Sequence, residues 1–175
     1  MARDLKRAAA GFAWAAIRHF VAAVATVCAA CLLWTVTYAV LILWAIVTNG
    51  GLGGPLAYPA GLFVIVLVAA AAAIALFFPA TAAAELIGRR WKVPFLAQIP
   101  VTVGVLAVLC LPAAIGVERF WSQAPSPRSV ATLAVWLFGL SLLPVGFYWW
   151  VAQSGTLLFK AVRALQRGRL LKNRL

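Results

Sequence analysis

A few side chains in this sequence have the types and spacing that membrane chemistry uses. Cys28 and Cys31 form a C-x-x-C pair on one helical turn, which can act as a redox couple. Glu85 could hold a cation or a proton, but it stands four residues before Arg89, the spacing of a helical ion pair. His19 stands at the start of a long apolar run. We expect a local ion pair for Glu85 and interfacial hydrogen bonding for His19.

Groups for other chemistry are scarce. The chain has one histidine, three acidic residues and three cysteines, too few for a haem or di-metal centre built from several histidines or carboxylates. The glycine-rich stretch 50–54 follows no predicted strand, so it does not match a phosphate-binding loop. No nucleophile has an obvious base. The sequence therefore predicts no catalytic, cofactor-binding or metal-binding residues, and no enzyme.

The C-x-x-C pair gives one limited resemblance. A chain of this length with four apolar segments and such a pair is similar to the disulfide-generating quinone reductases of bacterial inner membranes. Those proteins carry the pair at the periplasmic end of a span and use a second pair in a later periplasmic loop. Here Cys28 and Cys31 lie well inside the first apolar run, and residues 118–129 contain no cysteine. We expect both to be packing residues, and thiol–quinone redox activity is the third hypothesis for function.

The composition of the chain indicates the class of protein in which these residues lie. Of the 175 residues, 66% are hydrophobic and 10% charged, with a mean hydropathy of +1.03. A soluble domain has roughly 25% charged residues, so the composition predicts an all-α integral membrane protein. The net charge of +12 comes from residues that flank apolar runs. This favours anionic lipid headgroups as the partner and argues against nucleic acid.

The uncharged runs predict a bundle of four transmembrane helices. A helix over the first run, of 28 residues, reaches about 42 Å, more than the roughly 30 Å of a hydrocarbon core. The alternative is three spans, with the first or third run re-entrant, which would scatter the basic residues over both sides. The four predicted spans are residues 20–47, 60–84, 95–117 and 130–152.

Prolines interrupt three of these spans. Transporters use broken helices to expose backbone groups near the midplane, whereas ordinary membrane helices contain prolines as simple kinks. Because the sequence offers no evident intramembrane charge to bind an ion, we favour kinks. The prolines are Pro79, Pro100, Pro112 and Pro144.

Basic residues predict the orientation. With four spans, 13 of the 15 Lys and Arg residues lie on one side, so the positive-inside rule places both termini in the cytoplasm of a bacterial inner membrane. Residues 1–19 and 153–175 are predicted to be basic amphipathic helices on the membrane surface. The predicted lipid or partner contacts are Arg3, Lys6, Arg7, Arg18, Arg89, Arg90, Lys92, Lys160, Arg163, Arg167, Arg169, Lys172 and Arg174.

Small residues predict where helices approach closely, within one chain or between chains. The residues chosen on this basis are Ala25, Ala29, Ala69, Ala73, Gly139 and Gly146. The leading hypothesis for function is a non-enzymatic accessory, scaffold or sensing subunit that binds a membrane protein partner or a second copy of itself. The alternative is a small transporter, pore former or membrane-perturbing effector, whose lumen would need a polar stripe that the sequence does not show.

Overall fold

The computed structural model describes residues 2–51, 54, 56–92, 94–121 and 126–172, and side chains between Gly11 and Gly155 except Phe95. The structure is 94% helical, and none of the residues in these ranges forms a strand. The predicted all-α class is therefore confirmed. In chain order the elements are α1 (Ala2–Thr48), α2 (Ala57–Ala72), π-helical η1 (Ala73–Phe77), α3 (Phe78–Trp91), 3₁₀-helical η2 (Phe95–Ala97), α4 (Gln98–Trp121) and α5 (Pro127–Lys172).

Within the described ranges, four helices are long and apolar enough to cross a membrane, as expected of a multi-pass membrane protein. Each contains most of one predicted span and extends beyond it. The first is longer than predicted because Arg18 and His19 lie inside the helix and do not interrupt it. The four apolar stretches are Gly11–Thr48, Ala57–Trp91, Gln98–Trp121 and Pro127–Gly155.

The second long helix contains a local widening. α2, η1 and α3 follow one another without a break, and η1 is a single π-helical turn that ends at Phe77, two residues before Pro79. Proline has no N–H and its ring collides with the preceding turn, so the α-helical hydrogen bond from Pro79 to residue 75, inside η1, cannot form. Thr81 Oγ1 donates to the carbonyl oxygens of Phe77 (2.8 Å) and Phe78 (3.1 Å). The widened turn places Ala73, Leu76 and Phe77 in the core.

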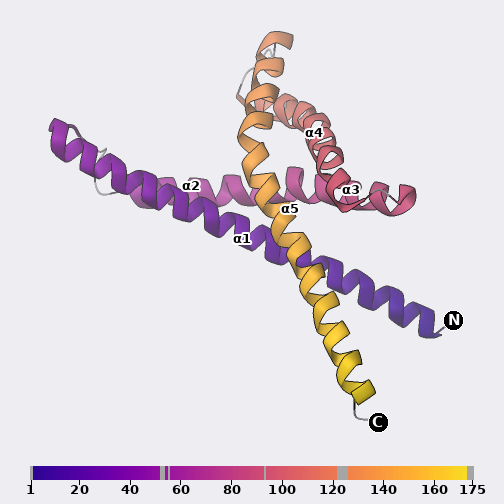
Figure 1. Ribbon diagram of the computed structural model, residues 1–175. Helices are drawn as coiled ribbons and strands as arrows, with labels where there is room; N and C mark the ends of the chain where they lie inside the picture. The colour runs from indigo at the N-terminus through magenta and orange to yellow at the C-terminus, as the bar shows by residue number, and fades with distance from the viewer. Residues whose placement is uncertain (1, 52–53, 55, 93, 122–125, 173–175) are drawn as a thin grey trace.

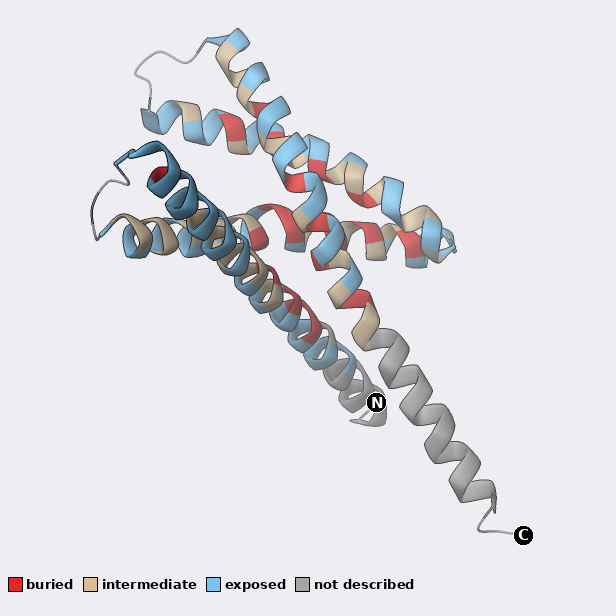
Figure 2. Ribbon diagram, turned by 60° about the vertical axis from the view of Figure 1, so that its left-hand side comes forward, coloured by how far each residue is buried: buried red, intermediate tan, exposed pale blue. Residues whose placement is uncertain are grey.

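The helices form two antiparallel hairpins that cross. α1 runs beside α2, and α4 packs against both α3 and α5 (Figure 1). The two hairpin tips diverge, and buried residues are concentrated where the hairpins cross, as Figure 2 shows. At the crossing, Ala22, Ala80, Leu106 and Tyr148 are at most 1% exposed. The helices of the predicted bundle thus pack together over only part of their length.

The first hairpin is held near its tip by aromatic packing. The rings of Trp34 and Tyr38 are 6.1 Å apart, and those of Tyr38 and Tyr58 are 5.1 Å apart. Trp34 Nε1 donates to the carbonyl oxygen of Tyr58 at 3.4 Å. Gly61 leaves room for the indole, because a Cβ atom there would lie 2.1 Å from Trp34 Cζ2.

The small residues predicted for helix packing have different surroundings. Ala73 is buried in the core, and Ala25, Ala29 and Ala69 are half-buried. Gly139 and Gly146 are exposed, and a Cβ at either position would meet nothing within 4 Å in the part of the chain described here. On α5 the buried face instead follows the helical series Ser141, Val145, Tyr148 and Ala152.

Candidate functional site

A cluster of polar side chains lies buried at the crossing of the hairpins. We call it the polar cluster, and it consists of Arg18 and His19 from α1, Glu85 from α3, and Tyr148 and Gln153 from α5. All five lie within the apolar helical stretches. Three elements far apart in the sequence therefore meet through hydrogen bonds and an ion pair at one point.

The ion pair between Arg18 and Glu85 is the strongest contact of the polar cluster. Arg18 Nη2 donates to both Oε1 and Oε2 of Glu85 at 2.6 Å, and the two side chains are only 6% and 12% exposed. Gln153 Nε2 donates to Glu85 Oε1 at 3.1 Å. Arg89 Nη2 lies 3.7 Å from Glu85 Oε2, but the Arg89 side chain is 74% exposed. Glu85 thus holds α1, α3 and α5 together.

His19 and Tyr148 form the second part of the polar cluster. A guanidinium group can only donate, so the 3.2 Å contact from Arg18 Nη2 makes His19 Nε2 an acceptor and assigns the ring proton to Nδ1. His19 Nδ1 can then donate to the Tyr148 hydroxyl at 3.2 Å. That hydroxyl donates to the backbone oxygen of His19, also at 3.2 Å. The two side chains close a small hydrogen-bonded ring between α1 and α5.

This arrangement is suited to holding helices together. Buried charges are tolerated when they are paired and hydrogen-bonded, and both conditions are met for the Glu85 carboxylate. Arg18 Nε is the exception, since it is buried without a hydrogen-bond partner among the residues described. The part of the chain described here contains no group of three or more His, Cys, Asp or Glu residues placed to hold a metal ion.

A groove of about 490 Å³ runs beside the polar cluster, between α1 and the η1–α3 segment. Its α1 wall runs from Phe12 to Ala23, and its opposite wall runs from Ala73 to Arg89. Phe78 lines it and packs edge-on against the His19 ring at a centroid distance of 5.1 Å. The groove is apolar along most of its length and has Arg89 at one end.

One prediction for an individual residue was wrong, and another was incomplete. Arg18 was predicted to contact lipid or a partner, but it is 7% exposed and bonded to Glu85. The predicted local pair of Glu85 with Arg89 is present at 3.7 Å, and Glu85 also has a closer partner, Arg18, 67 residues away. His19 is a hydrogen-bonded residue as expected, although it is buried between helices. Tyr148 and Gln153 were not predicted at all.

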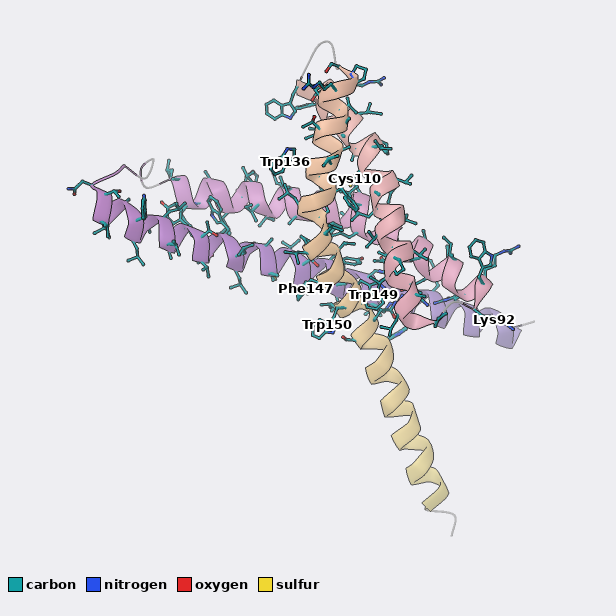
Figure 3. The ribbon with its side chains drawn as sticks, turned by 45° about the horizontal axis from the view of Figure 1, so that its top comes forward. Lys92, Cys110, Trp136, Phe147, Trp149 and Trp150 are labelled. Atoms are coloured by element: carbon teal, nitrogen blue, oxygen red, sulfur yellow. The ribbon has the colours of Figure 1, made fainter. Side chains whose placement is uncertain are left out.

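The other predicted contact residues fall into two groups. Arg89, Arg90 and Lys92 are exposed at the end of α3, and Figure 3 shows Lys92 there, away from the crossing. The remaining predicted contacts lie outside the described side chains; they are Arg3, Lys6, Arg7, Lys160, Arg163, Arg167, Arg169, Lys172 and Arg174.

The cysteines are all free thiols. Cys28 is exposed on α1, Cys31 is half-buried, and Cys110 is buried in the core of the crossing. Comparison of the chain with protein family models, with curated proteins and with solved structures yields no match. Proposals for its function therefore rest on its own geometry.

Proposed function

We propose that this chain is a multi-pass bacterial inner-membrane protein that acts as a non-enzymatic subunit of a larger membrane assembly. Its four apolar helices cross the bilayer, and both termini lie in the cytoplasm. A further membrane helix, from a partner protein or a second copy, packs on the outer face of α5. The basic ends of the chain contact anionic headgroups.

The divergence of the two hairpins supports a partner. Water provides no force between helices inside a bilayer, so helices associate through close packing and hydrogen bonds. In this chain such packing is concentrated at the crossing, where the polar cluster holds α1, α3 and α5. The tips lie apart (Figure 1), which leaves both hairpins free to take up additional helices.

The main support for the proposal is the outer face of α5, where large apolar side chains and glycines are exposed. Trp136, Phe147 and Trp150 lie on the side of α5 that faces away from α4 (Figure 3). Trp136 and Trp150 are more than 60% exposed, and Leu143 is 86% exposed. Gly139 and Gly146 lie seven residues apart on the same helix with open space above them. Glycines next to large side chains produce holes and knobs of the kind that membrane helices use to interlock.

Photo-crosslinking in the native host tests this proposal. A photoreactive amino acid at Leu143 should give a discrete crosslinked species, and the same residue at exposed Val108 on α4 serves as the matched control. Gly146→Leu should abolish the Leu143 crosslink, whereas Gly104→Leu, at an equally open glycine on α4, should leave it unchanged. Equal crosslinking from both helices, or none from Leu143, would contradict the proposal.

A second candidate function is movement of a proton or an ion. Ionisable residues within membrane helices often mark such pathways, and the polar cluster buries an Arg–Glu pair and a histidine in apolar helices. If this is correct, the full-length chain in liposomes carries a proton flux that Glu85→Gln abolishes and Glu118→Gln leaves intact. Absence of flux in the unaltered chain would leave the polar cluster with a structural role.

A further inference from the structure

We propose that the groove between α1 and the η1–α3 segment binds one acyl chain of an anionic phospholipid, with the headgroup held at the Arg89 end. This inference rests on the membrane insertion stated in the proposed function, but it does not require that the chain belongs to a larger assembly. It stands on the shape of the groove, the composition of its walls and the charge at its rim.

The walls of the groove are regular stripes of two antiparallel helices. On α1 the lining residues recur at three- and four-residue intervals, which places them on one face. Five of the fourteen lining residues are alanines, and these small side chains create the hollow. Phe12, Phe20 and Phe78 supply aromatic wall surface, and Tyr148 of α5 contributes from behind. A volume of about 490 Å³ is within the range of roughly 300–1,000 Å³ typical of ligand pockets.

The α1 wall of the groove matches one leaflet of a membrane in length. The α1 wall extends over 12 residues from Phe12 to Ala23, a rise of about 16 Å. Half of a hydrocarbon core is about 15 Å. The charged end of the groove coincides with the end of α3, where exposed Arg90, Trp91 and Lys92 follow Arg89. A chain lying in the groove therefore has its headgroup beside these residues.

The charge at the rim selects an anion. Glu85 lines the groove, but its charge is neutralised by Arg18, which is not a lining residue and lies 2.6 Å away. Arg89 is 3.7 Å from the same carboxylate and 74% exposed, so its guanidinium retains donors for a phosphate group. Two guanidiniums around one carboxylate leave one excess positive charge. His19 and Tyr148, already bonded to each other, offer the chain mainly ring surface.

Native mass spectrometry of the full-length protein with defined lipids tests this site. The protein in mild detergent is mixed with equal amounts of phosphatidylglycerol and phosphatidylcholine that carry the same chains. We expect one phosphatidylglycerol to be retained per chain. Ala16→Trp, which fills the open groove, should lower its retention at least tenfold, whereas Ala13→Trp, exposed on the same helix outside the groove, should not. Arg89→Gln should remove the preference for phosphatidylglycerol, and Arg128→Gln should retain it.

A second measurement uses the unaltered chain, so it tests the lipid site even if a tryptophan variant misfolds. Phosphatidylglycerol with a photoreactive group at the end of one chain should label peptides that contain Ala23 and Ala73, at the deep end of the groove. Labelling spread evenly over α4 and α5 would overturn the proposal. Equal retention in Ala16→Trp and Ala13→Trp, or equal retention of the two lipids, would also overturn it.

Discussion

One guanidinium nitrogen of Arg18 lies 2.6 Å from both carboxylate oxygens of Glu85, and these two residues are 67 positions apart in the chain. Through this contact α1 is fixed to α3 at the point where the hairpins cross. Gln153 donates to the same carboxylate, so α5 joins at that point too. The polar cluster therefore determines how the two hairpins are placed relative to each other.

Glu85→Gln should destabilise the fold markedly. The substitution preserves size but leaves the guanidinium of Arg18 buried without its counter-charge, and breaking such a pair costs about 3 kcal/mol or more. Equilibrium unfolding of the purified chain in mixed micelles measures the free energy. Glu118→Gln on α4, outside the polar cluster, is the matched control. A loss no greater than that of the control would show that the pair does not hold the crossing.

Combining Arg18→Gln with Glu85→Gln should recover much of the stability lost by either substitution alone. The double variant leaves no buried charge, and two amide side chains can still hydrogen-bond to each other. The double-mutant cycle should give a coupling free energy of about 1–3 kcal/mol, as measured for residues in direct contact. Strictly additive losses would indicate that the two side chains do not interact.

Tyr148→Phe should cost about 1 kcal/mol, the typical net value of one hydrogen bond. The substitution keeps the ring in the core but removes the hydroxyl that bridges Nδ1 and the backbone oxygen of His19. Tyr38→Phe, at a tyrosine whose ring packs in the first hairpin, is the control. Equilibrium unfolding in mixed micelles measures both free energies. Equal losses for the two substitutions would show that the Tyr148 hydroxyl does not stabilise the contact with His19.

Gly61→Val should disrupt the packing of the first hairpin. The new side chain would collide with the Trp34 indole, which is fixed by its hydrogen bond to Tyr58, and overpacking of this kind costs about 1–3 kcal/mol. Gly104→Val makes the same change in helix propensity at a position with open space. If the two variants unfold at the same denaturant concentration, the Trp34 contact is unimportant for stability.

The three cysteines should differ in their reaction with a maleimide. Exposed Cys28 should react readily in detergent, whereas buried Cys110 should react only after unfolding. Replacing both Cys28 and Cys31 by serine should change the free energy of unfolding by less than about 1 kcal/mol, since neither is fully buried. A disulfide between them in the protein isolated from its host would instead revive the redox hypothesis.

Much of the fold could be predicted because its signals are local. Apolar runs locate the four helices. The fourth span was predicted to begin at residue 130, whereas α5 begins at Pro127, where the Ser126 hydroxyl accepts from the Ser129 N–H at 3.0 Å. Pro79 signals a break, although proline alone does not distinguish a kink from the π-turn found at η1. The divergence of the hairpins could not be predicted, because hydropathy does not specify which helices touch.

The polar cluster could not be predicted because its contacts are non-local. Glu85 has a basic residue four positions away, and the local pair with Arg89 is the simplest interpretation of that spacing. The structure favours Arg18 because the crossing brings it closer and excludes water from the pair. A usable signal was present: Arg18 and His19 are polar residues inside a segment that remains helical from Ala2 to Thr48. Gly139 and Gly146 stay predictions for contact with another chain.

The most direct test of the central claim is native mass spectrometry of the full-length chain extracted from its own host membranes in mild detergent. If the chain is a subunit of a larger assembly, it should be recovered with a defined number of further polypeptides, foreign or identical to itself. Gly146→Leu should release it as a single chain of 18.6 kDa with its polar cluster intact. Recovery of the unaltered protein as a single chain under the mildest conditions would contradict the claim.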